Sequence, residues 1–215
     1  MLVFGHIGIT LGVGLAGIQI YGLIKKKRAT PKFNETLIKN PENEKRNIPV
    51  SKPAIDLFAI TFCILGSLLP DMIDKPIGHF LFKGVFHNNG RVFSHTLLFA
   101  FLTLCAGLYF YVSKKKLWLL ALSYGVFMHL ILDFMWQTPQ ILFWPLFGLN
   151  FPWSNEYNWS GIMIYKLLHN PQEYIIEFIG LFITGMSIWI LIREKYVVLS
   201  FPNRRRQINP SDSGR

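Results

Sequence analysis

Five long apolar segments, separated by polar stretches, dominate the chain and predict membrane-spanning helices. They cover roughly residues 4–24, 54–70, 94–113, 117–136 and 174–192. About 20 mainly apolar residues are needed to cross the hydrocarbon core of a bilayer as a helix. Polar stretches at 25–53 and 71–93 separate the early segments, whereas 137–173 is rich in tryptophan, tyrosine and proline, as is typical of the membrane interface. The pattern predicts an all-α polytopic membrane bundle of about five helices with an interfacial aromatic loop.

Composition supports this class and sets the domain organisation. Hydrophobic residues make up 51% of the chain and aromatic residues 15%, which is too apolar for an ordinary soluble domain of this size. We expect one membrane-embedded domain over residues 1–201 and a disordered basic tail over 202–215, where proline, serine and arginine dominate. The net charge of +10 comes from short clusters beside the apolar segments. The chain therefore offers no continuous basic face for nucleic acid.

The basic residues predict the orientation of the chain in the membrane. With five spans, 18 lysines and arginines fall on one side, in the first loop, the third loop and the tail, and four fall on the other. Cytoplasmic loops carry the excess of positive charge in membrane proteins. We expect a multi-pass inner-membrane protein with its N-terminus outside and its C-terminus in the cytoplasm.

This topology brings ionisable residues from four segments to the outer membrane face. They are His6, Asp71, Asp74, His95, His129 and Asp133. His129 and Asp133 are four residues apart, so both project from one helix face, and Asp71 and Asp74 are expected on a turn that follows Pro70. Ionisable groups are costly at membrane depth, and a convergent set indicates a functional site.

The residue types in this set are those of a metal site. Imidazole together with carboxylate suits Zn²⁺, Mn²⁺ or Fe²⁺, of which zinc is the expected ion. Six ligands exceed one tetrahedral site, so one ion with supporting partners and two ions both stay open. Asp74 is expected to bind metal or to act as a base, and Arg91 to orient a phosphate through its paired N–H donors. The ordinary alternative is that these residues make hydrogen bonds between helices or lie in water.

Glycines in the first segment produce a motif without its structural context. Gly12, Gly14 and Gly17 match the dinucleotide-binding pattern G-x-G-x-x-G, but they follow no strand and lie in an apolar span, so the pattern predicts no nucleotide site. Gly8 and Gly12 instead form a face of small residues that predicts close helix packing.

Three sequence elements and the early Gly5-His6 resemble a known family. The elements are Gly66-Ser-Leu-Leu-Pro-Asp71-Met-Ile-Asp74, Arg91-Val-Phe-Ser-His95-Thr and His129-Leu-Ile-Leu-Asp133. Their order resembles the LexA-binding, inner-membrane-associated metal-dependent hydrolases of bacteria and archaea, over residues 5 to about 150. Members of that family carry the second aspartate two positions after the first, whereas Asp74 follows Asp71 by three. The resemblance implies metal binding and hydrolase activity.

The function predicted from these observations is metal-dependent hydrolysis of an ester in a lipid-linked substrate, with a phosphoester expected. The interfacial loop 137–173 is expected to form a lid or a groove for acyl chains. Two alternatives remain open, namely a metal- or proton-coupled transporter and a non-catalytic membrane regulator with a structural metal. The chain has no H-E-x-x-H motif of a metalloprotease and no G-x-S-x-G motif of a serine hydrolase. It also lacks the S-G-H element of type-2 phosphatidic acid phosphatases.

Overall fold

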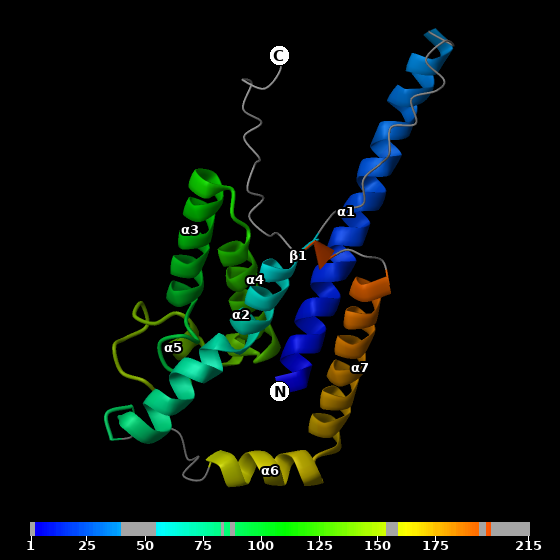
Figure 1. Ribbon diagram of the computed structural model, residues 1–215. Coiled ribbons are helices and arrows are strands. Elements are labelled where there is room, and N and C mark those ends of the chain that lie inside the picture. Colours follow the sequence, from blue (N-terminus) through cyan, green and yellow to red (C-terminus); the bar gives the residue numbers. More distant parts are fainter. Residues whose placement is uncertain are drawn as a thin grey trace, which may run out of the picture.

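A computed structural model gives the arrangement of the chain (Figure 1). It describes residues 3–39, 55–82, 84–86, 89–153, 159–193 and 197–198. The helices are α1 (Val3–Lys39), α2 (Leu57–Pro76), the π-helix η2 (Ile77–Leu81), α3 (Leu97–Lys114), α4 (Trp118–Leu132), the 3-10 helix η3 (Met135–Gln137), α5 (Pro139–Leu142), α6 (Trp159–His169) and α7 (Pro171–Arg193). The predicted tail at 202–215 lies outside the described residues.

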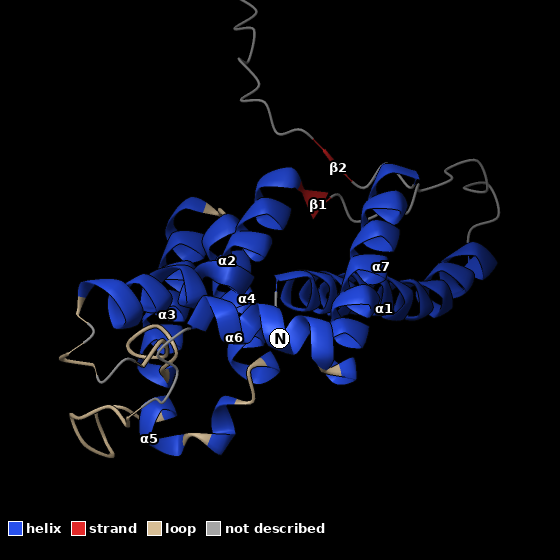
Figure 2. Ribbon diagram, turned by 90° about the horizontal axis from the view of Figure 1, so that it is seen from below, coloured by secondary structure: helices blue, strands red, loops and turns tan. Residues whose placement is uncertain are grey.

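The predicted all-α membrane fold is confirmed. Within the described part of the chain, four helical segments are long and apolar enough to cross a membrane, namely Val3–Ile24, Leu57–Leu81, Leu97–Lys114 and Pro171–Arg193. The strands found among the described residues are short, and Figure 2 shows them in red. They are β1 (Ile55–Asp56) and β2 (Val197–Val198), which pair in parallel over two residues each.

The helix boundaries differ from the prediction in three places. The span expected at 117–136 is the 15-residue helix α4, which at about 1.5 Å per residue is shorter than the hydrocarbon core. Helix α1 continues to Lys39, so part of the expected polar loop at 25–53 is helical. Helix α2 passes through Pro70 to Pro76, which corrects the turn expected after Pro70. Asp71 and Asp74 therefore lie on a helix.

Glycines set the closest helix contacts. A Cβ atom placed on Gly66 of α2 would lie 2.1 Å from the carbonyl oxygen of Leu122 in α4, and one on Gly125 of α4 would lie 2.4 Å from the carbonyl oxygen of Cys63. Helices α1 and α7 meet in the same way, because a Cβ on Gly8 would lie 2.0 Å from the carbonyl oxygen of Gly180. The predicted packing role of Gly8 is confirmed. Small residues allow such close approach of helix backbones in membranes.

Polar side chains lie inside this bundle and apolar ones cover much of its outside. Among the described residues, the fully buried side chains include His6, His95, His129 and Asp74, whereas many phenylalanines and leucines of α3 and α7 are exposed. Hydrocarbon tails of lipids can cover those apolar side chains, which water could not do without a free-energy cost. The bundle thus encloses these polar groups beside a buried apolar cluster that includes Val92, Val126 and Met135.

The segment predicted to lie in the membrane interface contains helices α5 and α6. Figure 1 shows α6 lying across the end of the bundle below α7. The N-terminus of α1 lies toward this same end of the molecule. Side chains of Tyr165 and Leu168 on α6 are 63% and 68% exposed, as expected for an apolar face directed at lipid.

Candidate metal centre

Two helices and one loop carry the candidate site. Asp71 lies on α2, His129 lies on the last turn of α4, and Asp133 follows directly after that turn. His95 lies in the loop before α3, one residue before the helix cap at Thr96, whose hydroxyl accepts a hydrogen bond from the backbone N–H of Phe99 at 3.1 Å. The close α2–α4 packing at Gly66 and Gly125 brings Asp71 within reach of His129.

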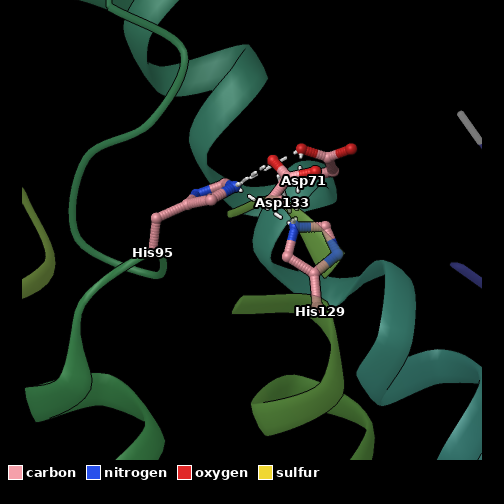
Figure 3. Close-up of side chains that lie close together, drawn as sticks. All are labelled: Asp71, His95, His129 and Asp133. Atoms are coloured by element: carbon pink, nitrogen blue, oxygen red, sulfur yellow. Dashed lines mark hydrogen bonds and ion pairs between the residues drawn. The ribbon is translucent and has the colours of Figure 1, made fainter. Parts of the chain in front are cut away.

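Four of the predicted residues converge (Figure 3). One ligand atom from each of Asp71, His95, His129 and Asp133 lies within 4.8 Å of the other three. The Nε2 atoms of His95 and His129 are 3.2 Å apart, and Asp71 Oδ1 lies 3.5 Å from His95 Nε2 and 3.9 Å from His129 Nε2. Both histidines are fully buried. These four residues, called the four-residue set below, could hold a metal ion.

Hydrogen bonds on the far side of each ring fix which nitrogen faces the centre. His129 Nδ1 lies 2.7 Å from the carbonyl oxygen of Ser67, and His95 Nδ1 lies 2.8 Å from Asp74 Oδ2. Both partners are acceptors, so each Nδ1 carries the proton and donates it. In the neutral rings, both Nε2 atoms then present lone pairs to each other. Two facing lone pairs repel unless a cation or a proton lies between them.

Asp74 lies behind His95 and outside the four-residue set. Its carboxylate is fully buried and accepts hydrogen bonds from the backbone N–H groups of Val92 at 2.7 Å and of Ser94 and His95 at 3.1 and 3.2 Å. With His95 Nδ1 as a further donor, the acceptor capacity of Asp74 is largely used. Asp74 therefore orients His95, as carboxylates do behind many metal-binding histidines. The structure does not bring it among the ligand atoms, where the sequence placed it.

His6 lies beside the four-residue set. Its ring stacks on that of His129, with centroids 4.4 Å apart, and its Nε2 lies 3.2 Å from Asp133 Oδ1. The residue is 1% exposed, and its Nδ1 has no hydrogen-bond partner among the described residues. His6 therefore contacts His129 through its ring face and Asp133 through its Nε2, but it is not one of the four residues of the set.

Glu177 holds the first turn of α1 and was not singled out from the sequence. This acid of α7 is 9% exposed, and its carboxylate accepts hydrogen bonds from the backbone N–H groups of Phe4 at 2.9 Å and Gly5 at 3.2 Å. The first N–H groups of a helix lack partners within the helix and attract negative charge. Glu177 thus fixes the turn that carries His6. An acidic residue inside an apolar segment is the sequence signal that would have identified it.

Basic residues border the set on its open side. The Arg91 guanidinium lies 3.0 and 3.2 Å from Asp133 Oδ2 through Nη2 and Nε, and its side chain is 45% exposed. Lys75 forms an ion pair with Asp71, one turn earlier on α2. Arg91 has donors beyond the two that contact Asp133, so it can bind a further anion at the surface of the site.

The surroundings shift the proton affinity of two groups outside the spans. Burial alone would raise the pKa of Asp133, but the hydrogen bond from His6 and the charge of Arg91 outweigh burial and hold that pKa below its ordinary value. Burial alone would lower the pKa of His95, but Asp71 and Asp74 accept hydrogen bonds from its ring and raise the pKa above its ordinary value. These two shifts favour the charged forms of Asp133 and His95.

Comparison with known proteins gives the family. A family model described as YdjM inner membrane protein matches residues 1–197. The chain belongs to the YdjM inner membrane protein family. No curated protein and no solved structure gives a match to the chain. Membership of this family and the four spanning helices show a membrane protein, while LexA binding and hydrolase activity stay predictions of the resemblance.

Proposed function

We propose that this member of the YdjM family is a membrane-bound metal-dependent hydrolase that cleaves a phosphoester, or another ester, of a lipid-linked substrate at the outer membrane face. The observation that carries the proposal is the pair of Nε2 atoms 3.2 Å apart, each with its Nδ1 already donating. For the site to face outward, the N-terminus must lie outside and the C-terminus in the cytoplasm, as the distribution of basic residues predicts.

The donor set fits a transition metal. Ligand atoms about 2.1 Å from one zinc ion are about 3.4 Å apart in a tetrahedron. The separations of 3.2, 3.5 and 3.9 Å between the ligand atoms of His95, His129 and Asp71 lie close to that spacing. Nitrogen and carboxylate oxygen together favour zinc, manganese or iron over magnesium or calcium. His6 is suited to join the set for a larger ligand number or a second ion.

The chain supplies the remaining parts of a hydrolytic site. A metal held by the set would lower the pKa of a bound water and polarise a phosphoryl oxygen. Arg91 would bind a phosphate oxygen through the N–H donors that do not face Asp133. Asp74 would keep the ring of His95 in position through Nδ1. Asp71, whose side chain is 20% exposed, is the member of the set that a substrate would meet first. Arg91 would thus bind the substrate, and Asp74 would orient a metal ligand.

Metal analysis of the protein purified in detergent tests the first half of the proposal. We expect bound transition metal in the unaltered chain and its loss in a variant carrying His129→Ala and Asp133→Ala. His169→Ala is the matched control, because His169 is exposed on α6 and hydrogen-bonds only the backbone of Tyr165 among the partners described. Equal metal content in all three proteins would contradict the metal site.

Hydrolysis tests the second half. We expect the metal-loaded protein to release phosphate from phosphatidic acid in mixed micelles, and Arg91→Gln to raise KM while the metal content is unchanged. A protein that binds metal and releases no product from phosphate esters or carboxylic esters of lipids would favour a structural metal in a regulator. Metal uptake by proteoliposomes would favour the transporter. Reporter fusions at both termini test the proposed orientation.

A further inference from the structure

Asn89 links two segments that are distant in sequence. The residue is 7% exposed. Its Nδ2 donates to the carbonyl oxygen of Pro152 at 3.0 Å, and its Oδ1 accepts a hydrogen bond from the backbone N–H of Arg91 at 2.9 Å. The N–H group can only donate and the carbonyl can only accept, so one of the two orientations of the amide satisfies both. Asn89 therefore joins residues 89–95, called the Arg91 loop below, to the segment 144–152.

Aromatic rings hold the same two segments together. Phe93 of the Arg91 loop lies edge-to-face against Trp144 and Phe151, with ring centroids 5.3 and 5.4 Å apart. Phe86, which precedes the loop, also meets Phe151 edge-to-face, at 5.8 Å. Edge-to-face packing is a preferred arrangement of aromatic pairs, and Phe151 is buried. The segment 144–152 is thus a packed surface on which the Arg91 loop lies.

The start of the Arg91 loop is also in close contact with η2. A Cβ atom placed on Gly78 of η2 would overlap the carbonyl oxygen of Asn89, and one placed on Gly90 would overlap Nε2 of His79 in η2. Glycine, which has no Cβ, allows such a close approach of one segment to another. The backbone just before Arg91 is therefore held by η2 as well as by the segment 144–152.

Arg91 is the residue of this loop that offers free donors beside the four-residue set. Its guanidinium contacts Asp133 Oδ2 at 3.0 and 3.2 Å, and its side chain is 45% exposed. A long side chain loses rotamer freedom when it is fixed. Here Asn89 fixes the backbone end of Arg91 and Asp133 fixes the guanidinium end. A phosphate that binds the remaining N–H donors then meets an arginine that is already ordered, and such preorganisation favours binding.

We propose that Asn89 is a positioning residue for the phosphate of the substrate. Through its two hydrogen bonds it ties Arg91 to the segment 144–152, in the orientation that leaves the free donors of the guanidinium toward the phosphate. This rests on the proposed function and deepens it, because it identifies what supports the phosphate-binding arginine. It also gives the segment 144–152 a part in substrate binding, although Asn89 itself is buried and acts only through Arg91.

Binding of a phosphonate tests this role without turnover. The probe is a short-chain phosphonate analogue of phosphatidic acid, whose phosphorus–carbon bond resists hydrolysis, and it is titrated into the metal-loaded full chain in detergent. Diacylglycerol of the same chain length corrects for partition into the micelle. We expect Asn89→Ala to weaken binding roughly tenfold. Metal content should not change, because Asp74 holds the backbone N–H groups of Val92 and Ser94 independently of Asn89.

A double-mutant cycle separates positioning of Arg91 from general support of the loop. If Asn89 acts through Arg91, Asn89→Ala should have little further effect on phosphonate affinity in a chain that already carries Arg91→Gln. Two losses of affinity that multiply, or an unchanged affinity in Asn89→Ala, would overturn the role of Asn89 and leave the proposed function intact. If Arg91→Gln alone leaves the affinity unchanged, the phosphate site of the proposed function is overturned together with the role of Asn89.

Two further variants complete the test. Asn89→Ser keeps an acceptor near the N–H of Arg91 but is too short to reach Pro152, so it should also weaken phosphonate binding, and it replaces Asn89→Ala if that variant fails to fold. Asn170→Ala is the matched control, because Asn170 accepts the same kind of bond, from the backbone N–H of Gln172 at 3.1 Å, at the start of α7. We expect unchanged affinity in the control. Full affinity in Asn89→Ser, or an equal loss in Asn170→Ala, would overturn the proposal.

Discussion

Replacing Gly66 by alanine tests whether the α2–α4 contact sets the geometry of the candidate metal centre. The added Cβ would lie 2.1 Å from the carbonyl oxygen of Leu122, whereas ordinary contact begins at 3.4 Å. Both partners are helix backbone, so the two helices must separate by roughly 1 Å to relieve the overlap. Overpacking of this kind costs about 1–3 kcal/mol of folding free energy.

The same displacement acts on the four-residue set, because Asp71 lies on α2 and His129 on α4. Their ligand atoms are already 3.9 Å apart, and sites that are about 1 Å too loose lose function. We expect Gly66→Ala to lower the unfolding temperature and to weaken metal binding on the order of tenfold or more. Thermal unfolding followed by helical circular dichroism and metal titration of the chelator-stripped protein give the two numbers.

Gly17→Ala is the control for this experiment. A Cβ on Gly17 meets no described atom within 4 Å, and alanine is favoured over glycine within a helix by about 1 kcal/mol. We expect unchanged metal binding and equal or slightly higher stability. If Gly66→Ala has the same unfolding temperature and the same metal affinity as the unaltered protein, the reasoning from the glycine contact is refuted.

Three further results are expected. Asp74→Asn should weaken metal binding about 10- to 100-fold with the fold retained, because the carboxylate orients His95 without binding metal itself. A chelator-competition titration measures the affinity, and an unchanged value would count against the positioning role. Glu177→Leu should destabilise the protein by about 2–4 kcal/mol, since it leaves two α1 N–H groups unpaired in an apolar environment. Glu177→Gln should lower the free energy of unfolding by less, and denaturant unfolding in detergent compares the two variants. Because the pKa of His95 is raised, its protonated ring stabilises the metal-free fold below about pH 6.5, and this contribution is lost as pH rises through the raised pKa. Metal affinity should change in the opposite sense and weaken as pH falls through the raised pKa of His95. A curve of metal affinity against pH with its midpoint at or below the ordinary imidazole value of about 6.5 would contradict this.

The convergence of the site followed from the sequence because it needed only helix positions and charge. Counting lysines and arginines placed His6, Asp71, His95 and Asp133 at one face, and the structure brings them to one end of the bundle. Helical spacing gave the common face of His129 and Asp133. These inferences depend only on which end of a segment a residue occupies and on which side of the membrane that end lies, and the segment bounds and the charge count give both.

The roles within the site did not follow, because they depend on hydrogen bonds between segments distant in sequence. Asp74 and His95 are both suitable metal ligands by type, and only the loop amides around Asp74 show which one faces inward. The helical path through Pro70 was likewise hidden, since proline usually ends or kinks a helix. Neighbouring segments in a membrane bundle can satisfy the backbone groups that a proline leaves free.

The contact of Glu177 with the start of α1 has a consequence for how the protein is made. Helix α1 leaves the ribosome before α7, which lies more than 130 residues later in the chain. A nascent chain inserted up to α4 already carries the four-residue set, yet the amides of Phe4 and Gly5 lack the carboxylate that accepts their hydrogen bonds in the finished protein. The turn bearing His6 therefore gains this support only after α7 has been inserted.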